Sequence, residues 1–146
     1  MFRVRTILFP TDFSSYSNQA YLHAVALAEK YRATLFVVYV TTPGQEADHD
    51  YWRGQLEQIR PANPRIPVEH VLLEGDPATE IVRYARDSGI HLIVMGTHGR
   101  TGVERMLMGS VAEKVLRDAP CSVLVVKLPR GMPRAGRPDV ELVTSH

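Results

Sequence analysis

VEHVLLEGDPATEIVRYARDSGIHLIVM, residues 68–95, carries a complete strand–helix–strand pattern. The apolar runs at 68–73 and 91–95 are typical of strands, and Asp76 and Pro77 are residue types that favour the start of a helix between them. That helix has an apolar stripe at helical spacing and a glycine at its end, formed by Ala78, Ile81, Val82, Ala85 and Gly89. A helix that joins two strands in this way predicts a parallel pair.

The same alternation extends over most of the chain. Further apolar runs lie at 4–9, 35–40 and 121–126, and most are near-continuous, as in strands buried on both faces; 68–73 alternates in part, as at a sheet edge. A helix is expected through Ala20 to Tyr31 after Ser14 or Ser15, and a short one at 46–60. A third is expected after Ser110, which with Glu113 makes an S-x-x-E capping box, and Pro120 stops it. The sequence therefore predicts an α/β fold in a single doubly wound domain, a five-stranded parallel sheet with helices on both faces.

Composition excludes several classes of protein. The 146 residues suit one domain, the formal net charge of +1 gives no basic field for nucleic acid, and no apolar run approaches the ~20 residues of a membrane span. The first ten residues lack the pattern of a signal peptide, so we expect a cytoplasmic protein. The single cysteine, Cys121, opens an apolar run and is expected to be a buried structural thiol.

GTHGRTGVERMLMGS, residues 96–110, has four glycines directly after a strand-like run. It is neither a Walker A loop, because it lacks G-K-[ST], nor G-x-G-x-x-G, because its spacing is G-x2-G-x2-G. It delivers Gly109 and Ser110 to a helix N-terminus, where free N–H groups favour an anion such as phosphate. The alternative is that Ser110 only caps the helix and the glycines only turn the chain. Asp12, which follows the first strand, is expected across the same crevice, where the strand order reverses.

The pattern Gly96-x2-Gly99-x9-Gly109-Ser110 resembles the ATP-binding branch of the universal stress protein family. The blocks ILFPTDFS, GDPATEIVRYA and CSVLVV occur with it in the expected order, so that the resemblance covers residues 2–127. It implies the sheet order 3-2-1-4-5 and ATP, with Mg²⁺, as the cofactor. It leaves residues 129–146 as a flexible or partner-docked tail after a domain of residues 1–128.

The resemblance also implies which residues hold the nucleotide. Pro10, Thr11 and Asp12 would lie at the nucleoside, with Asp12 near the base or ribose, and the backbone of Val40 at adenine. The ribose and phosphates would be lined by Gly96, Gly99, Gly109, Ser110 and Val111. Position and charge add Met95, His98, Arg100 and Arg105, and for His98 and Arg100 the alternative is a solvated loop face. For Asp12 the alternative is a turn carboxylate beside Ser14.

Three classes of function compete. The first is a nucleotide-occupied stress or signalling module with at most slow ATP hydrolysis, and the second an interaction protein with a vestigial pocket. The third, an ATP-dependent enzyme, is weaker, because the glycine stretch offers arginines but neither a lysine nor paired carboxylates. We identify no catalytic residue and no metal site.

A homodimer through residues 121–127 is also expected. In the order 3-2-1-4-5 this strand closes one edge of the sheet, and an apolar edge strand presents unpaired backbone groups unless it is covered. The tail is the alternative cover, through VELV at 140–143.

Overall fold

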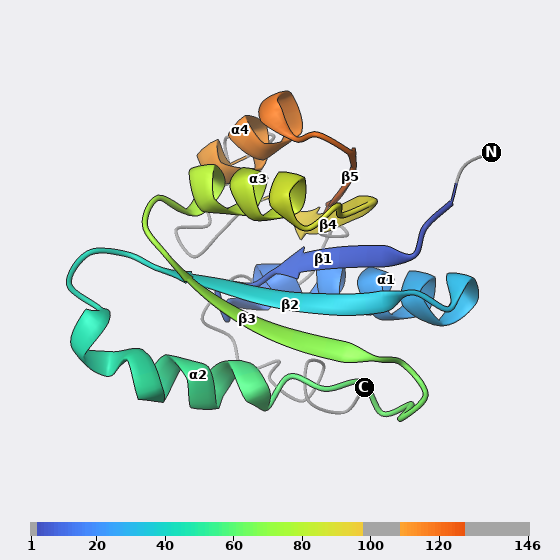
Figure 1. Ribbon diagram of the computed structural model, residues 1–146, viewed down its shortest axis with the longest axis horizontal. Helices are drawn as coiled ribbons and strands as arrows, with labels where there is room; N and C mark the ends of the chain where they lie inside the picture. Colours follow the sequence, from blue (N-terminus) through green and yellow to red (C-terminus); the bar gives the residue numbers. More distant parts are fainter. Residues whose placement is uncertain (1–2, 98–108, 128–146) are drawn as a thin grey trace.

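A computed structural model describes residues 3–97 and 109–127 of the chain. Strands and helices alternate in it (Figure 1), as the sequence predicts. The strands are β1 (Thr6–Pro10), β2 (Thr34–Thr41), β3 (Val68–Glu74), β4 (Leu92–Gly96) and β5 (Ser122–Val126). The helices are α1 (Ser15–Tyr31), the 3-10 helix η1 (Glu46–Asp48), α2 (His49–Glu57), α3 (Pro77–Asp87) and α4 (Ser110–Asp118).

The five strands form one parallel sheet of order β3-β2-β1-β4-β5, which confirms the predicted fold and order. β1 is central: its Ile7 is the register partner of Leu35 in β2 and of Leu92 in β4. The partly alternating strand, β3, lies at an edge as expected. The order reverses at β1, because the chain runs from β1 to β2 and β3 on one side and then returns to β4 on the other.

Helices cover both faces of the sheet, which explains the near-continuous apolar strands. α1 and α2 pack on one face over a core that includes Phe9, Leu35 and Leu56. α3 and α4 lie side by side on the other face, over a core that includes Leu8, Val38 and Ile93 (Figure 1). Alternate residues of one strand thus enter different cores, and both sets must be apolar.

The expected ends of α3 are confirmed. Asp76 is the N-cap and accepts a hydrogen bond from the Thr79 N–H at 3.0 Å, Pro77 is the first helical residue, and Gly89 follows the helix with φ +63°. α4 ends just before Pro120, also as expected.

The capping box expected at α4 is wrong. Gly109 is the N-cap and has no side chain that could accept a hydrogen bond, and Ser110 is already the first helical residue. At α1, Ser14 takes the N-cap position but likewise caps nothing with its side chain. The burial expected for Cys121 is found in part: the thiol is partly buried against the core that α3 and α4 cover, and that burial raises its pKa.

Candidate functional site

The carboxyl ends of β1 and β4 lie side by side where the strand order reverses. Residues 11–14 leave β1 there and lead into α1, and Thr97 leaves β4. The Gly109 N–H donates to the Thr97 carbonyl at 2.5 Å, so the first residue described after the glycine-rich segment lies against the last residue described before it. The start of α4 is thereby held at the end of β4.

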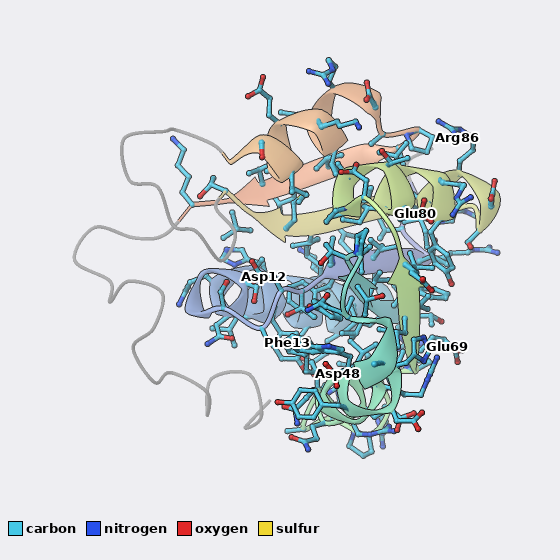
Figure 2. All side chains as sticks on the ribbon, turned by 90° about the vertical axis from the view of Figure 1, so that its left-hand side faces the viewer. Asp12, Phe13, Asp48, Glu69, Glu80 and Arg86 are labelled. Atoms are coloured by element: carbon cyan, nitrogen blue, oxygen red, sulfur yellow. The ribbon has the colours of Figure 1, made fainter. Side chains whose placement is uncertain are left out.

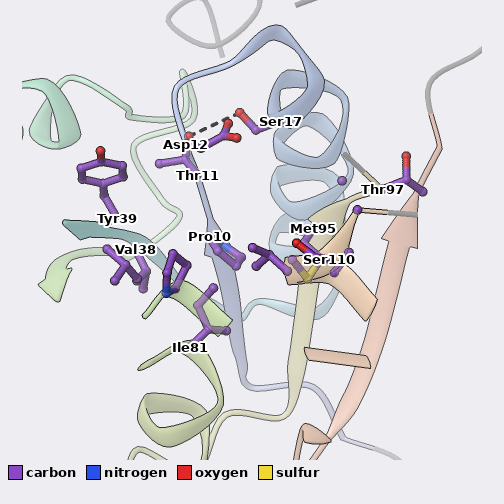
Figure 3. A pocket seen from close by; sticks show the side chains of 16 residues that line it. Pro10, Thr11, Asp12, Ser17, Val38, Tyr39, Ile81, Met95, Thr97 and Ser110 are labelled. Carbon is purple, nitrogen blue, oxygen red and sulfur yellow. Dashed lines mark hydrogen bonds between the residues drawn. The ribbon is translucent and has the colours of Figure 1, made fainter. Parts of the chain in front are cut away.

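A cavity of about 290 Å³ opens at this place (Figure 3). Nine of the residues expected at the nucleotide line it: Pro10, Thr11, Asp12, Val40, Met95, Gly96, Gly109, Ser110 and Val111. The other expected residues, His98, Gly99, Arg100 and Arg105, lie outside the described residues. The volume is close to the lower end of the ~300–1,000 Å³ that is usual for small-molecule sites.

The walls of the cavity differ in chemistry. Val38, Val40, Ile81 and Met95 supply apolar surface from β2, α3 and β4. Asp12 is the one charged side chain among the described residues that line it. A mainly apolar pocket with few polar groups is the usual form of a small-molecule site.

Asp12 also organises its own loop. Its Oδ1 accepts from the Ser14 N–H at 3.0 Å and from the Ser14 hydroxyl at 2.5 Å. The carboxylate is therefore a turn carboxylate beside Ser14 and, at the same time, a residue of the cavity wall. Phe13, its neighbour in this loop, lies below it toward α2 (Figure 2) and has φ +64°.

Thr11 connects this loop to β2 and to α1. The Thr11 N–H donates to the Val38 carbonyl at 2.8 Å, which joins the loop to β2. The Thr11 hydroxyl accepts from the Phe13 N–H at 3.0 Å and lies 3.4 Å from the Ser17 hydroxyl. These bonds join the loop to β2 and to the start of α1.

The N-terminus of α4 faces the cavity. Ser110, Val111 and Ala112 all line it, and their N–H groups belong to the first turn, which has no intrahelical acceptor for them. The first N–H to find such an acceptor is that of Glu113, which donates to the Gly109 carbonyl at 3.0 Å. Such donors, with the helix dipole, favour a negatively charged ligand.

Gly109 has φ −72° and ψ 162°, a conformation open to any residue. A left-handed turn is therefore not the reason for glycine at this position. Gly109 lines the cavity, and without a side chain its backbone is open to close approach by a ligand.

A polar contact joins α3 and α4 beside the cavity. Lys114 Nζ lies 3.0 Å from the Thr79 hydroxyl and 3.5 Å from Asp76 Oδ2. Hydrogen bonds from the Thr79 side chain and backbone, with a smaller contribution from Lys114, lower the pKa of Asp76. Pro77, between them in sequence, belongs to the cavity wall.

Sequence reasoning missed part of the wall, namely Ser17, Val38, Tyr39, Pro77, Ile81, Thr97 and Ala112. Thr97 and Ala112 adjoin expected residues in the chain, so adjacency was a usable signal for them. Ile81 was assigned to the stripe of α3, and nothing in its spacing distinguishes a core residue from one at a cavity.

Comparison with known proteins shows the family of this chain. The model of the universal stress protein family matches residues 3–127. The chain belongs to this family. A universal stress protein of Methanocaldococcus jannaschii is 38% identical over 142 residues, which cover 86% of this chain and 84% of the relative.

Two solved structures agree with the fold. Universal stress protein UspA from Lactobacillus plantarum has a TM-score of 0.72 and 28% identity, covering 85% of this chain and 98% of that one. A universal stress protein in complex with cAMP has a TM-score of 0.66 and 25% identity, covering 84% of this chain and 96% of the other. Members of the family thus include a protein that binds an adenine nucleotide.

The described residues also lack two other kinds of feature. None of their helices has the length and apolar character needed to cross a membrane. Nor do three or more of their His, Cys, Asp or Glu side chains gather in a group able to hold a metal ion.

Proposed function

We propose that this universal stress protein binds ATP in the cavity at the ends of β1 and β4 and acts as a nucleotide-occupied stress or signalling module, with at most slow hydrolysis. The observation that carries the proposal is that one cavity gathers nine expected residues from four separate segments of the chain. The cAMP complex of a family member supports an adenine nucleotide as the ligand.

The two kinds of wall suit the two ends of ATP. The apolar surface of Val38, Val40, Ile81 and Met95 would take the base, and Asp12 the ribose. The first turn of α4 would take phosphate oxygens through its N–H groups, with Gly109 leaving room for close approach. Mg²⁺ would bind together with the phosphates. We propose that His98, Gly99 and Arg100 also line the phosphate end of the site.

The ATP-dependent enzyme is the weaker alternative. Phosphoryl transfer needs a positioned base, a cationic clamp and Mg²⁺ ligands, whereas Asp12 is the single carboxylate among the described wall residues. The second alternative, an interaction protein without functional nucleotide binding, is decided by titration.

The first experiment is to identify any nucleotide released by heat from the purified protein, by mass spectrometry, and to titrate ATP with Mg²⁺ into ligand-free protein. Gly109→Val should abolish binding and leave the circular dichroism spectrum unchanged, because the backbone at 109 accepts a β-branched residue. Gly54→Val is the matched control, since Gly54 is exposed on α2 and a Cβ there meets no atom within 4 Å.

Wild-type protein that carries no nucleotide and shows neither heat nor a melting shift at millimolar ATP would overturn the proposal. The interaction protein would then take its place. Release of a product other than ADP would select the enzyme.

Two substitutions test which end of the ligand lies where. Asp12→Asn keeps an acceptor for Ser14 and removes the charge, so it should weaken ATP and AMP by the same factor. Ser110→Ala should weaken ATP more than adenosine, because Ser110 lies at the proposed phosphate end. Equal losses for all ligands with Ser110→Ala would place the phosphates elsewhere.

We also propose a homodimer through residues 121–127. β5 pairs with β4 on one side, and its other edge has no strand among the described residues. Leu124 of β5 is exposed, which favours a covered rather than a solvated edge.

Sedimentation tests the dimer. Val125→Lys on β5 should shift the protein to monomer, whereas Glu69→Lys, on the exposed side of the opposite edge strand β3, should not. A monomer at tens of micromolar, unchanged by Val125→Lys, would contradict it. Removal of residues 129–146 tests the tail. If the tail covers the edge, a chain ending at 128 should associate more strongly than the full chain. Its ATP binding should be unchanged, because the proposed site lies within residues 1–128.

A further inference from the structure

Phe13 has a backbone conformation that is rare for a bulky residue. Its φ of +64° lies in the left-handed region, which is unfavourable for an aromatic residue unless the surroundings impose it. Such outliers concentrate at functional sites. Here the outlier directly follows Asp12, the charged residue of the cavity wall.

The conformation sends neighbouring side chains to different places. Asp12 lines the cavity, whereas the Phe13 ring packs against Tyr39 and Trp52, at centroid distances of 4.8 Å and 5.6 Å. Hydrogen bonds hold the turn from within, through Thr11 and Ser14. The aromatic contacts hold it from the side of α2.

Tyr39 belongs to both the cavity and this aromatic group. It lines the cavity and lies 4.9 Å from Trp52 between ring centroids. Its hydroxyl lies 3.2 Å from Gln45 Nε2, and Gln45 Oε1 accepts from the Thr42 N–H at 2.8 Å. Tyr39 therefore connects the end of β2 to the segment that leads into α2.

Trp52 is one of the α2 side chains that pack on the sheet. Leu56 is the one fully buried side chain of α2, and Trp52, one turn earlier on the same face, is partly buried against the same core. Tyr51, exposed to 58%, touches the Trp52 ring edge-on at 5.0 Å. A shift of the Phe13 or Tyr39 ring would thus change the packing of Trp52 and of α2.

We propose that Phe13, Tyr39 and Trp52 are positioning residues for the nucleotide site, coupling its occupancy to the packing of α2 on the sheet. The inference rests on the proposed function, since it takes ATP as the ligand of the cavity. Binding fixes Asp12 and the end of β2, which fixes the rings of Phe13 and Tyr39 and, through Trp52, holds α2 more tightly. Coupling of this kind is reciprocal, so a change at Trp52 must change affinity in the cavity.

Affinity variants give the first test. Trp52 does not line the cavity, so Trp52→Leu should weaken ATP only through Phe13 and Tyr39, by about fivefold or more, the lower end of usual coupling between sites. Trp52→Phe keeps a ring for stacking and should restore an affinity close to the wild type. Tyr84→Leu is the matched control, because it disrupts the separate Phe36–Tyr84 ring pair on the other face of the sheet.

Hydrogen exchange gives the second test of the coupling. Saturating ATP should slow exchange of the α2 amides, 49–57, in wild-type protein and slow it far less in Phe13→Leu. The sole tryptophan, Trp52, should report the same event as a fluorescence change. Each variant is titrated under conditions in which its urea unfolding curve shows that it is folded. A loss of global stability then does not lower the measured affinity.

The results separate the two proposals. If wild-type protein fails to bind ATP, the proposed function itself is wrong. If it binds, and Trp52→Leu retains wild-type affinity with α2 exchange unchanged by ATP, the cavity holds nucleotide and the coupling is refuted.

Discussion

Tyr21 offers a direct test of the energetics of the core. Tyr21 is a residue of α1, its side chain is fully buried 5.3 Å from the Phe9 ring between centroids, and its hydroxyl has no hydrogen-bond partner among the described residues. A buried polar group without a partner costs about 1–3 kcal/mol. Tyr21→Phe removes that group and keeps the ring.

The magnitude follows from two opposing effects. Removal of the unpaired hydroxyl should stabilise the fold by about 1–3 kcal/mol. The void left by one oxygen, about 10 Å³, should cost roughly 0.2 kcal/mol at ~24 cal/mol per Å³. The net effect at neutral pH should be near 1 kcal/mol or more in favour of Tyr21→Phe, which corresponds to about 3–4 °C in Tm for a domain of this size.

Alkaline pH should enlarge the difference. Burial raises the pKa of Tyr21 to about 12, from 10.0. Above pH 10 the unfolded chain loses the phenolic proton while the folded chain keeps it, so wild-type stability falls as pH rises from 10 to 12. The loss relative to Tyr21→Phe should reach about 2–3 kcal/mol, at ~1.36 kcal/mol for each pH unit.

Urea unfolding of both proteins at pH 7 and at intervals up to pH 11, where about half of this loss (~1.4 kcal/mol) should have developed, measures both effects. Equal m-values would show that the comparison concerns stability alone. A Tyr21→Phe protein less stable than the wild type by more than 1 kcal/mol at pH 7, with parallel pH profiles, would refute the reasoning. It would mean that the hydroxyl makes a favourable hydrogen bond in the folded protein.

Three further changes should lower the stability of the fold. Asp76→Ala should cost about 1 kcal/mol in urea unfolding through the lost cap, and the lowered pKa of Asp76 means that this contribution is present above pH 3.8 and disappears as pH falls through the folded value. Gly75→Ala, at φ +133° with the Glu80 side chain 3.2 Å from the new Cβ, should lower Tm, and an unchanged Tm would contradict the strain. Leu56→Ala should cost about 2–5 kcal/mol, and a cost below 1 kcal/mol would show that α2 is weakly attached.

The sequence by itself determined the order and type of the elements. The apolar runs are long enough for strands buried on both faces, and residues such as Asp76, Pro77 and Gly89 act within one turn of the chain. Local chemistry of this kind can be read from neighbours in sequence, because the groups that satisfy each other are few residues apart. The glycine spacing likewise pointed to the end of β4 as the site.

Only the tertiary structure decided how distant segments meet. It placed the first turn of α4, with Gly109 as the cap, against Thr97, where sequence alone favoured Ser110 as the cap. It brought Phe13, Tyr39 and Trp52 into one aromatic group and left the Tyr21 hydroxyl without a partner among the described residues. Each of these depends on contacts between residues far apart in the chain, and side-chain spacing along one element carries no information about which element will cover it.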